Sequence, residues 1–282
     1  MWIYLQDQFV PREKAKISVL DYGFLYGDGL FETFRAYEGR IFRLSEHLDR
    51  LGRAADRLAL SPPSAEILEN LLYETLRRNR LKEALLRLTL SRGEGAPGLN
   101  PAPCTVPTLV ITARKFEGYP KDDYLNGVSG VIVQARRHAA ALDPGLKSIS
   151  FLSNILAKLE AKKKGAFEGI FLNTEGALCE GAVSNLFWIR EGRLKTAAAP
   201  AGILEGITRR AVLELARRMK IETEEGFYPA GDLFAAEEAF LTSSGLELMP
   251  LTSVDGKKIG KGLPGRLTQR LHHAFREAVR ER

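Results

Sequence analysis

The sequence predicts an α+β protein built from two lobes. Strand-like and helix-like segments are mixed without strict alternation, which favours an α+β fold. The 282 residues are enough for two medium-sized domains. A short segment with Gly118 and Pro120 is the best linker candidate. We therefore expect a smaller N-terminal α/β domain over residues 1–115, a linker over 116–121 and a larger domain over 122–282.

Alternation and turn residues predict two strands at the start of the first domain. Residues 2–10 alternate apolar and polar side chains and stop at Pro11, which is typical of a strand. A glycine-punctuated loop from residue 19 then leads into a strand that reaches Tyr37. Glu38-Gly39 provides the turn that ends this strand.

Two amphipathic helices and two further strands are expected next. The first helix should begin at Ser45 as its N-cap, and the second should follow the Ser/Pro segment 61–64. Strands are expected at 84–91 and 106–113, joined by the Gly/Pro-rich segment 93–107. The helix residues expected in the core are Leu48, Leu51, Ala55 and Leu58, then Ile67, Leu68, Leu71, Leu72 and Leu76.

The second domain reads as short strands interrupted by helices. Gly165 is a stop signal for one helix, and Thr208 opens another. The expected elements are a strand at 128–135, a helix at 153–164, strands at 168–172, 184–189 and 193–197, a helix from 208, a strand at 238–242 and a last helix from about 264.

The charge pattern argues against a nucleic-acid partner. Lys and Arg number 41 against 35 Asp and Glu, which gives a net charge of +6. The basic residues are scattered over helical segments among acidic ones, and no reading motif accompanies them. This balance favours an enzyme that handles anionic substrates and an anionic cofactor.

The chain also lacks the patterns of a membrane or secreted protein. No apolar run reaches the roughly 18 residues of a membrane helix, and the N-terminus has no signal-peptide pattern. Cys104 and Cys179 lie far apart and form no metal-ligand cluster. We expect reduced thiols, no metal, no membrane partner and a cytoplasmic location.

Three stretches carry residues suited to one cofactor. Lys147 lies in Lys-Ser-Ile-Ser-Phe-Leu-Ser-Asn, Glu180 opens Glu-Gly-Ala-Val-Ser-Asn, and Gly206-Ile-Thr opens a helix. An amine nucleophile, a carboxylate and a glycine turn at a helix start are the parts that hold pyridoxal 5'-phosphate (PLP). They supply a Schiff-base lysine, an acid facing the ring nitrogen and a phosphate cradle.

These stretches, in this order, resemble the class IV (fold-type IV) PLP enzymes. Two more signatures of that family stand in the opening lobe, Asp21-x-Gly-Phe-x-x-Gly-Asp-Gly-x-Phe-Glu-Thr33 and His47-x-x-Arg50. The resemblance covers nearly the whole chain. It implies a two-lobed fold like that of D-amino-acid aminotransferase. The family includes branched-chain aminotransferases, D-amino-acid aminotransferases and aminodeoxychorismate lyases.

The resemblance assigns a catalytic residue and a cofactor-binding set. Lys147 would bond the cofactor and then move the proton at Cα of the substrate. Glu180 would face the pyridine nitrogen, and Arg50 would bind the phosphate. His47, His272 and His273 receive no role. The whole cofactor-binding set is Arg50, Lys147, Glu180, Asn185, Ile207, Thr208, Ser243 and Ser244.

The pocket residues leave the reaction open. The positions of the D-specific Arg-x-His pair read Pro97-Gly98-Leu99, and the Tyr-x-Arg of branched-chain enzymes reads Leu85-Leu86-Arg87. We expect an aminotransferase that uses a branched-chain amino acid and a 2-oxo acid such as 2-oxoglutarate, because most of the family transaminate. Release of pyruvate and 4-aminobenzoate by a lyase is the alternative, and a non-standard D-amino-acid aminotransferase comes third. The candidate substrate-binding residues are Tyr26, Phe31, Arg35, Arg87 and Arg92.

The resemblance also implies a homodimer. Family members close each active site with a loop of the neighbouring subunit, for which residues 92–103 are the candidate.

Overall fold

The computed structural model describes residues 1–102, 104, 106–138 and 145–280, and it divides into two compact units. The N-terminal unit comprises residues 1–117 together with 146–151, and the C-terminal unit comprises 118–145 and 152–282. Lys147 therefore belongs to the N-terminal unit although it follows the first strand of the C-terminal unit in the sequence. None of the described helices is long and apolar enough to cross a membrane.

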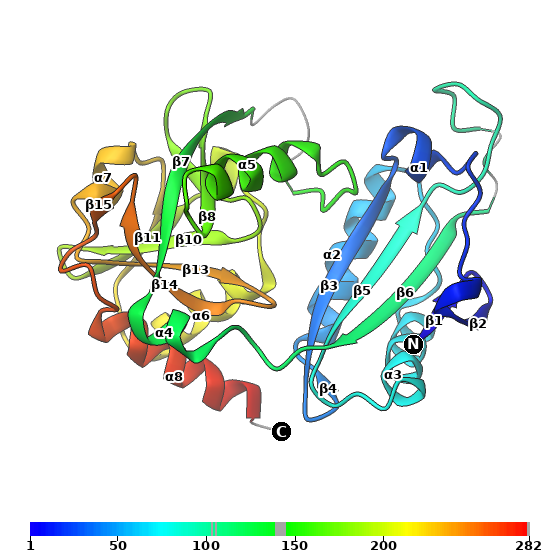
Figure 1. The fold of residues 1–282 in the computed structure, drawn as a ribbon, viewed down its shortest axis with the longest axis horizontal. Coiled ribbons are helices and arrows are strands. Elements are labelled where there is room, and N and C mark those ends of the chain that lie inside the picture. The colour runs from blue at the N-terminus through cyan, green and yellow to red at the C-terminus, as the bar shows by residue number, and fades with distance from the viewer. Residues whose placement is uncertain (103, 105, 139–144, 281–282) are drawn as a thin grey trace. The chain divides into compact units, whose positions relative to one another are not determined.

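The N-terminal unit is a six-stranded antiparallel sheet packed against two helices, α2 (Leu44–Arg57) and α3 (Ala65–Arg78) (Figure 1). The strands lie in the order β2-β1-β6-β5-β3-β4. A short helix, α1 (Tyr22–Tyr26), precedes β3. The strands are β1 (Trp2–Leu5), β2 (Gln8–Pro11), β3 (Gly29–Tyr37), β4 (Arg40–Ile41), β5 (Ala84–Ser91) and β6 (Thr108–Lys115).

The core of this unit lies between the sheet and the two helices. Every second residue of β3 and β5 enters it, as the two-residue period of a strand requires. Burying one such leucine contributes about 1.5–3 kcal/mol. The predicted stripes are confirmed except at Ile67, whose side chain is 50% exposed. The buried members include Leu30, Phe34, Leu86, Leu88, Leu48, Leu51, Leu68, Leu72 and Leu76.

Two predictions for this unit were wrong. Residues 2–10 form a hairpin and not one strand, because Gln6 takes a positive φ of 58° and turns the chain at Gln6-Asp7. Ser45 does not cap α2, which begins at Leu44 with Arg43 at the N-cap and has no side-chain cap. Ser64 does cap α3, since its Oγ accepts the N–H of Ile67 at 3.4 Å.

The C-terminal unit is a nine-stranded sheet that closes on itself as a barrel (Figure 1). The main path runs β12-β11-β10-β13-β14-β7-β8-β9, and β9 pairs again with β10. The closing pair is Glu180 opposite Asn185. The strands are β7 (Val128–Arg137), β8 (Glu168–Asn173), β9 (Leu178–Gly181), β10 (Asn185–Arg190), β11 (Arg193–Ala197), β12 (Thr223–Gly226), β13 (Glu238–Ser243), β14 (Glu247–Val254) and β15 (Lys257–Lys258).

The helices of this unit are α4 (Lys121–Asn126), α5 (Leu152–Lys163), α6 (Ile207–Arg218), α7 (Ala230–Phe234) and α8 (Arg266–Arg280). The predicted helices α5, α6 and α8 are confirmed, and α5 ends before Gly165, whose φ is 69°. The short elements α4, α7, β9, β12, β14 and β15 were not predicted. Most of them are too short to show a period, and β14 is nearly continuously buried, so it has no alternation to detect.

Candidate active site

Lys147 is positioned by backbone pairing with the start of β3. The N–H of Phe31 donates to the carbonyl of Lys147 at 2.9 Å, and the N–H of Ile149 donates to the carbonyl of Gly29 at 3.0 Å. Leu30 and Ser148 form the bridge between these two bonds. The register of this short antiparallel pairing fixes Lys147 beside Phe31.

Two residues predicted for the site, Lys147 and Arg87, come together around the ring of Phe31, which is itself a predicted substrate-binding residue. The Lys147 Nζ lies 4.4 Å from the ring centroid, and the Arg87 guanidinium lies 3.8 Å from it. Phe151 packs edge-on against the same ring at 5.2 Å. The Arg87 Nε donates to Thr89 Oγ1 at 3.2 Å, and burial lowers the pKa of Arg87. Although Arg87 as a whole is exposed, its guanidinium and the Lys147 amine thus lie against one phenylalanine ring.

Arg50 is buried and oriented by a carboxylate that the sequence analysis did not assign. Its Nε and Nη2 donate to the two oxygens of Glu32 at 2.8 and 2.7 Å. His47 Nδ1 lies 2.8 Å from Glu32 Oε2. Burial alone would raise the pKa of Glu32, but the charge of Arg50 and the hydrogen bonds with His47 and Arg50 outweigh it and hold that pKa at about 2.

The protonated, charged form of His47 is disfavoured in this cluster. Burial lowers the pKa of His47, Glu32 opposes the change, and the charges of Arg50 and Lys147 add to it. A signal for the cluster was present in the sequence. Glu32 alternates with Leu30 and Phe34 on a core-facing strand, and a carboxylate at such a position needs a buried partner.

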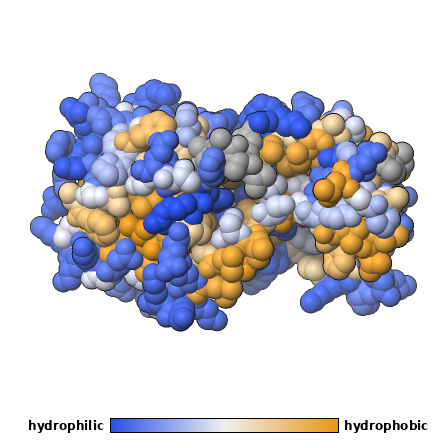
Figure 2. Space-filling view, turned by 90° about the horizontal axis from the view of Figure 1, so that it is seen from above, coloured by the Kyte–Doolittle hydropathy of each residue, from blue (hydrophilic) through white to orange (hydrophobic). Residues whose placement is uncertain are grey.

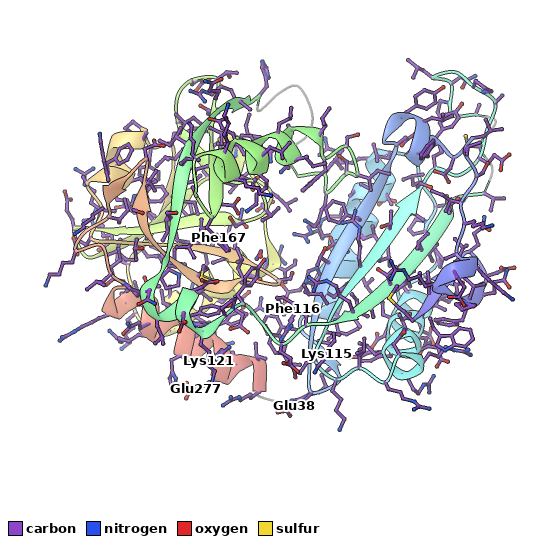
Figure 3. The ribbon with its side chains drawn as sticks, in the orientation of Figure 1. Glu38, Lys115, Phe116, Lys121, Phe167 and Glu277 are labelled. Carbon is purple, nitrogen blue, oxygen red and sulfur yellow. The ribbon has the colours of Figure 1, made fainter. Side chains whose placement is uncertain are left out.

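The other predicted substrate residues are engaged within the N-terminal unit. Arg35 donates to Glu83 Oε2 at 3.0 Å and to the carbonyl of Phe116, the residue after β6 (Figure 3). Arg92 donates to both oxygens of Asp28, at 2.5 and 3.2 Å. The Tyr26 hydroxyl accepts the N–H of Gly98 at 2.9 Å.

In the C-terminal unit, Glu180 and Asn185 meet at the closure of the barrel. Glu180 Oε2 accepts from Asn185 Nδ2 at 3.2 Å and from the N–H of Leu204 at 3.0 Å. Glu180 Oε1 accepts from Arg137 Nη2 at 3.2 Å. Arg137 had no role in the sequence analysis, because it lies 43 positions from Glu180 and only the barrel brings the two together.

The start of α6 has the form of an anion site. Ile207 and Thr208 are buried, Gly206 is the N-cap, and no side chain caps this end of the helix. A Cβ on Gly206 would lie 2.2 Å from Asn185 Oδ1, so a larger residue there would force the helix start or Asn185 to shift. Backbone N–H groups at such a start favour a phosphate.

Hydroxyl groups follow at the end of β13. The Ser243 Oγ accepts the N–H of Leu246 at 3.2 Å in the turn that contains Ser244. The neighbouring Thr242 is 1% exposed, and its Oγ1 has no hydrogen-bond partner among the described residues. Because a buried hydroxyl rarely goes unpaired, this atom is suited to meet a ligand.

The donor set fits PLP. The N-terminal unit holds an amine and a guanidinium, Lys147 and Arg50. The C-terminal unit holds the carboxylate of Glu180, the uncapped helix start and the orphaned hydroxyl of Thr242. Among the described residues there is no His, Cys, Asp or Glu cluster that could hold a metal ion.

Comparison with known proteins gives a consistent result. The family model described as amino-transferase class IV matches residues 29–254. A Methanocaldococcus jannaschii protein provisionally named a branched-chain-amino-acid aminotransferase is 38% identical over 98% of this chain and 96% of its own. The aminodeoxychorismate lyase of Bacillus subtilis is 35% identical over 99% and 94%. The solved branched-chain amino acid aminotransferase of T.th. with pyridoxamine 5'-phosphate superposes with a TM-score of 0.94, at 33% identity over 99% and 93%.

Proposed function

Because the chain belongs to the class IV aminotransferase family, we propose that it moves the amino group of a branched-chain amino acid to a 2-oxo acid such as 2-oxoglutarate. The chain is a PLP-dependent transaminase, and the branched-chain substrate is our inference. When bound, PLP withdraws electrons from the Cα of the substrate.

The single observation that carries the substrate proposal is the surrounding of Lys147. Its amine and the Arg87 guanidinium contact one phenylalanine ring, and Phe151 packs beside them. Arg87 can bind a substrate carboxylate, and the two phenylalanines favour an aliphatic side chain over a polar one. Lys147 would carry the proton at Cα.

The remaining residues are proposed to hold the cofactor. Arg50, oriented by Glu32, would bind the phosphate as a fork. Glu180 would accept a hydrogen bond from the ring nitrogen, with Asn185 fixing its carboxylate. The remaining phosphate donors would be the N–H groups of Ile207 and Thr208 and the hydroxyls of Ser243 and Ser244.

A panel of substrates tests this proposal. Purified PLP-loaded protein is given 2-oxoglutarate with L-leucine, L-valine or D-alanine, and in a separate reaction aminodeoxychorismate. We expect L-glutamate and the branched 2-oxo acid from the first two, little product from D-alanine and no 4-aminobenzoate. The Lys147→Ala variant should lose this turnover by at least about 10²–10⁴-fold. Formation of 4-aminobenzoate without 2-oxo acid from leucine would establish the lyase instead.

We also propose that the protein is a homodimer. Apolar residues are exposed at several places on the surface (Figure 2). Those of α5 form a stripe at i, i+3, i+4 and i+7, with exposed fractions between 53% and 67%: Leu152, Ile155, Leu156 and Leu159. Such a stripe on one helix favours a protein partner.

Sedimentation tests the dimer proposal. Leu156→Glu with Leu159→Glu should lower the mass from two chains to one, whereas Lys163→Glu on the same helix should not. A monomeric wild type would exclude the dimer.

The free thiols Cys104 and Cys179 support a cytoplasmic location.

A further inference from the structure

Arg137 ends β7 and reaches the carboxylate of Glu180 from within the C-terminal unit. Its guanidinium lies 4.4 Å from the ring centroid of Phe171 on the neighbouring strand β8. Its Nη2 donates to Glu180 Oε1 at 3.2 Å. The Nε is buried and has no hydrogen-bond partner within the described part of the chain. The ring and the carboxylate therefore fix the guanidinium beside Glu180.

Both carboxylate oxygens of Glu180 accept hydrogen bonds. Its side chain is 10% exposed. Arg137 binds one oxygen, and the neutral donors Asn185 Nδ2 and the Leu204 N–H bind the other. Every donor of this set stabilises the ionised carboxylate, and the charged one does so most strongly. Without the guanidinium, the neutral donors would have to offset the burial of a full charge.

We propose that Arg137 is a positioning residue that keeps Glu180 ionised, so that the ring nitrogen of PLP carries the proton between them. The inference rests on the proposed role of Glu180 opposite that nitrogen. An ionised carboxylate and an unprotonated pyridine nitrogen are both acceptors, so a hydrogen bond between them needs one proton. Whether the carboxylate or the nitrogen carries that proton depends on their relative proton affinities. Arg137 lowers the affinity of Glu180 and leaves the proton on the ring.

The neighbouring strand position supplies a matched control. Arg136 is exposed, and its Nη1 donates to backbone carbonyls of its own strand, including that of Gln134 at 2.9 Å. Replacing it removes the same charge from the next position of β7 without removing a contact of Glu180. Arg137→Met keeps an apolar stem over Phe171 without the charge, and Arg137→Lys keeps the charge without the planar fork.

The test is the ¹⁵N chemical shift of protein-bound PLP labelled at the ring nitrogen. Wild type and Arg136→Met should give the shift of a protonated ring. Arg137→Met should move it toward the value of neutral pyridine, and Arg137→Lys should restore most of the difference. An unchanged shift in Arg137→Met would overturn the proposal. Absence of bound PLP in the wild type would instead refute the proposed function.

A second measurement needs no bound cofactor. In cofactor-free protein, the infrared band of a protonated carboxyl group reports the pKa of Glu180, identified by its loss in Glu180→Gln. We expect Arg137→Met to raise that pKa by about one unit or more, a tenfold change in proton affinity. An equal pKa in wild type and Arg137→Met would overturn the proposal whether or not the variant binds PLP.

Discussion

At the residue scale, the proposed role of Lys147 depends on the side chains around its amine. Phe31 contacts both the amine and the Arg87 guanidinium, so the three residues form one cluster (Lys147, Phe31, Arg87). Lysine and arginine can have separate tasks there, because the guanidinium is a fixed fork that suits a carboxylate and the amine is a nucleophile. Replacing the lysine and replacing the arginine should therefore have different effects.

Replacing Arg87 should weaken substrate binding more than cofactor binding. Arg87→Gln loses a charged hydrogen-bond donor, and such bonds contribute about 1.5–3 kcal/mol, so kcat/KM for the amino acid should fall about 10- to 100-fold. The control is Arg114→Gln, since Arg114 is also an exposed arginine over a phenylalanine ring, that of Phe116, but lies outside the cluster that contains Lys147. Steady-state kinetics with PLP in excess measure the effect. Equal kcat/KM in the two variants would remove Arg87 from the substrate site.

The buried carboxylates predict how stability depends on pH. The pKa values of Glu32 and Glu247 are about 2 in the folded protein, against an ordinary value of 4.5. Because folding lowers these pKa values, the stabilisation is complete above about pH 4.5 and is lost as pH falls toward 2. The loss is on the order of 3 kcal/mol for each group.

Urea unfolding of wild type and Glu32→Gln between pH 3 and 7 isolates this effect. The wild type should be the more stable at neutral pH, and the difference should shrink below pH 4.5 because Glu32 then takes up a proton in the unfolded chain. A difference that stays constant over the whole range would contradict the ion pair with Arg50.

At the scale of elements, α8 supports the turn before β14. Glu247 has a positive φ of 54° and is 4% exposed. His272 Nε2 lies 2.8 Å from its carboxylate, and Arg276 Nε donates to the same oxygen at 2.9 Å. Tyr124 stacks on His272 and donates to the carbonyl of Leu246 at 3.1 Å. These contacts offset the cost of an unfavourable backbone conformation next to Ser243 and Ser244.

Breaking this support should destabilise the C-terminal unit. Glu247→Gln removes the charge from two partners and should lower the free energy of unfolding by about 1.5–3 kcal/mol. The matched control is Glu277→Gln on the exposed side of α8 (Figure 3), where Glu277 pairs with His273 at 3.3 Å. That variant should change stability by no more than about 0.5 kcal/mol. Denaturant unfolding measures the free energy of unfolding of both variants. Similar losses of stability in the two would refute the supporting role of Glu247.

The start of α6 gives a second prediction for an element. Gly206→Ala places a Cβ 2.2 Å from Asn185 Oδ1, so either the helix start or Asn185 must shift. We expect weaker PLP binding, about tenfold or more for a loss of one charge-assisted hydrogen bond. Gly52→Ala, in the middle of α2 with open space around it, should bind PLP like wild type and gain about 0.5–1 kcal/mol in stability. Unchanged PLP titration of Gly206→Ala would contradict the proposed cradle.

At the scale of the whole molecule, the sequence predicted more of the regular elements than of the supporting contacts. Residues 84–91 were expected as a strand and form β5 with those bounds, because alternation and flanking turns are local signals. The hairpin of β1 and β2 was missed, because Gln6-Asp7 contains no glycine to mark the turn. Local sequence patterns therefore predict helices and strands with few errors where the turns between them contain the usual turn residues.

In the candidate site, too, residues in local motifs could be predicted and residues that act through long-range contacts could not. Lys147 and Glu180 stand in motifs that can be recognised within a few residues. Glu32 and Arg137 act on Arg50 and Glu180 across 18 and 43 positions. Such pairs depend on strand register and barrel closure, which no local pattern contains.

Transamination through Lys147 is tested most directly by a single-turnover reaction. PLP-loaded protein is mixed with L-leucine in the absence of any 2-oxo acid, and the products are counted per bound cofactor. We predict close to one molecule of 4-methyl-2-oxopentanoate, with the amino group retained on the cofactor as pyridoxamine 5'-phosphate, and neither product from Lys147→Ala. Absence of the oxo acid, together with release of pyruvate and 4-aminobenzoate from aminodeoxychorismate, would contradict transamination.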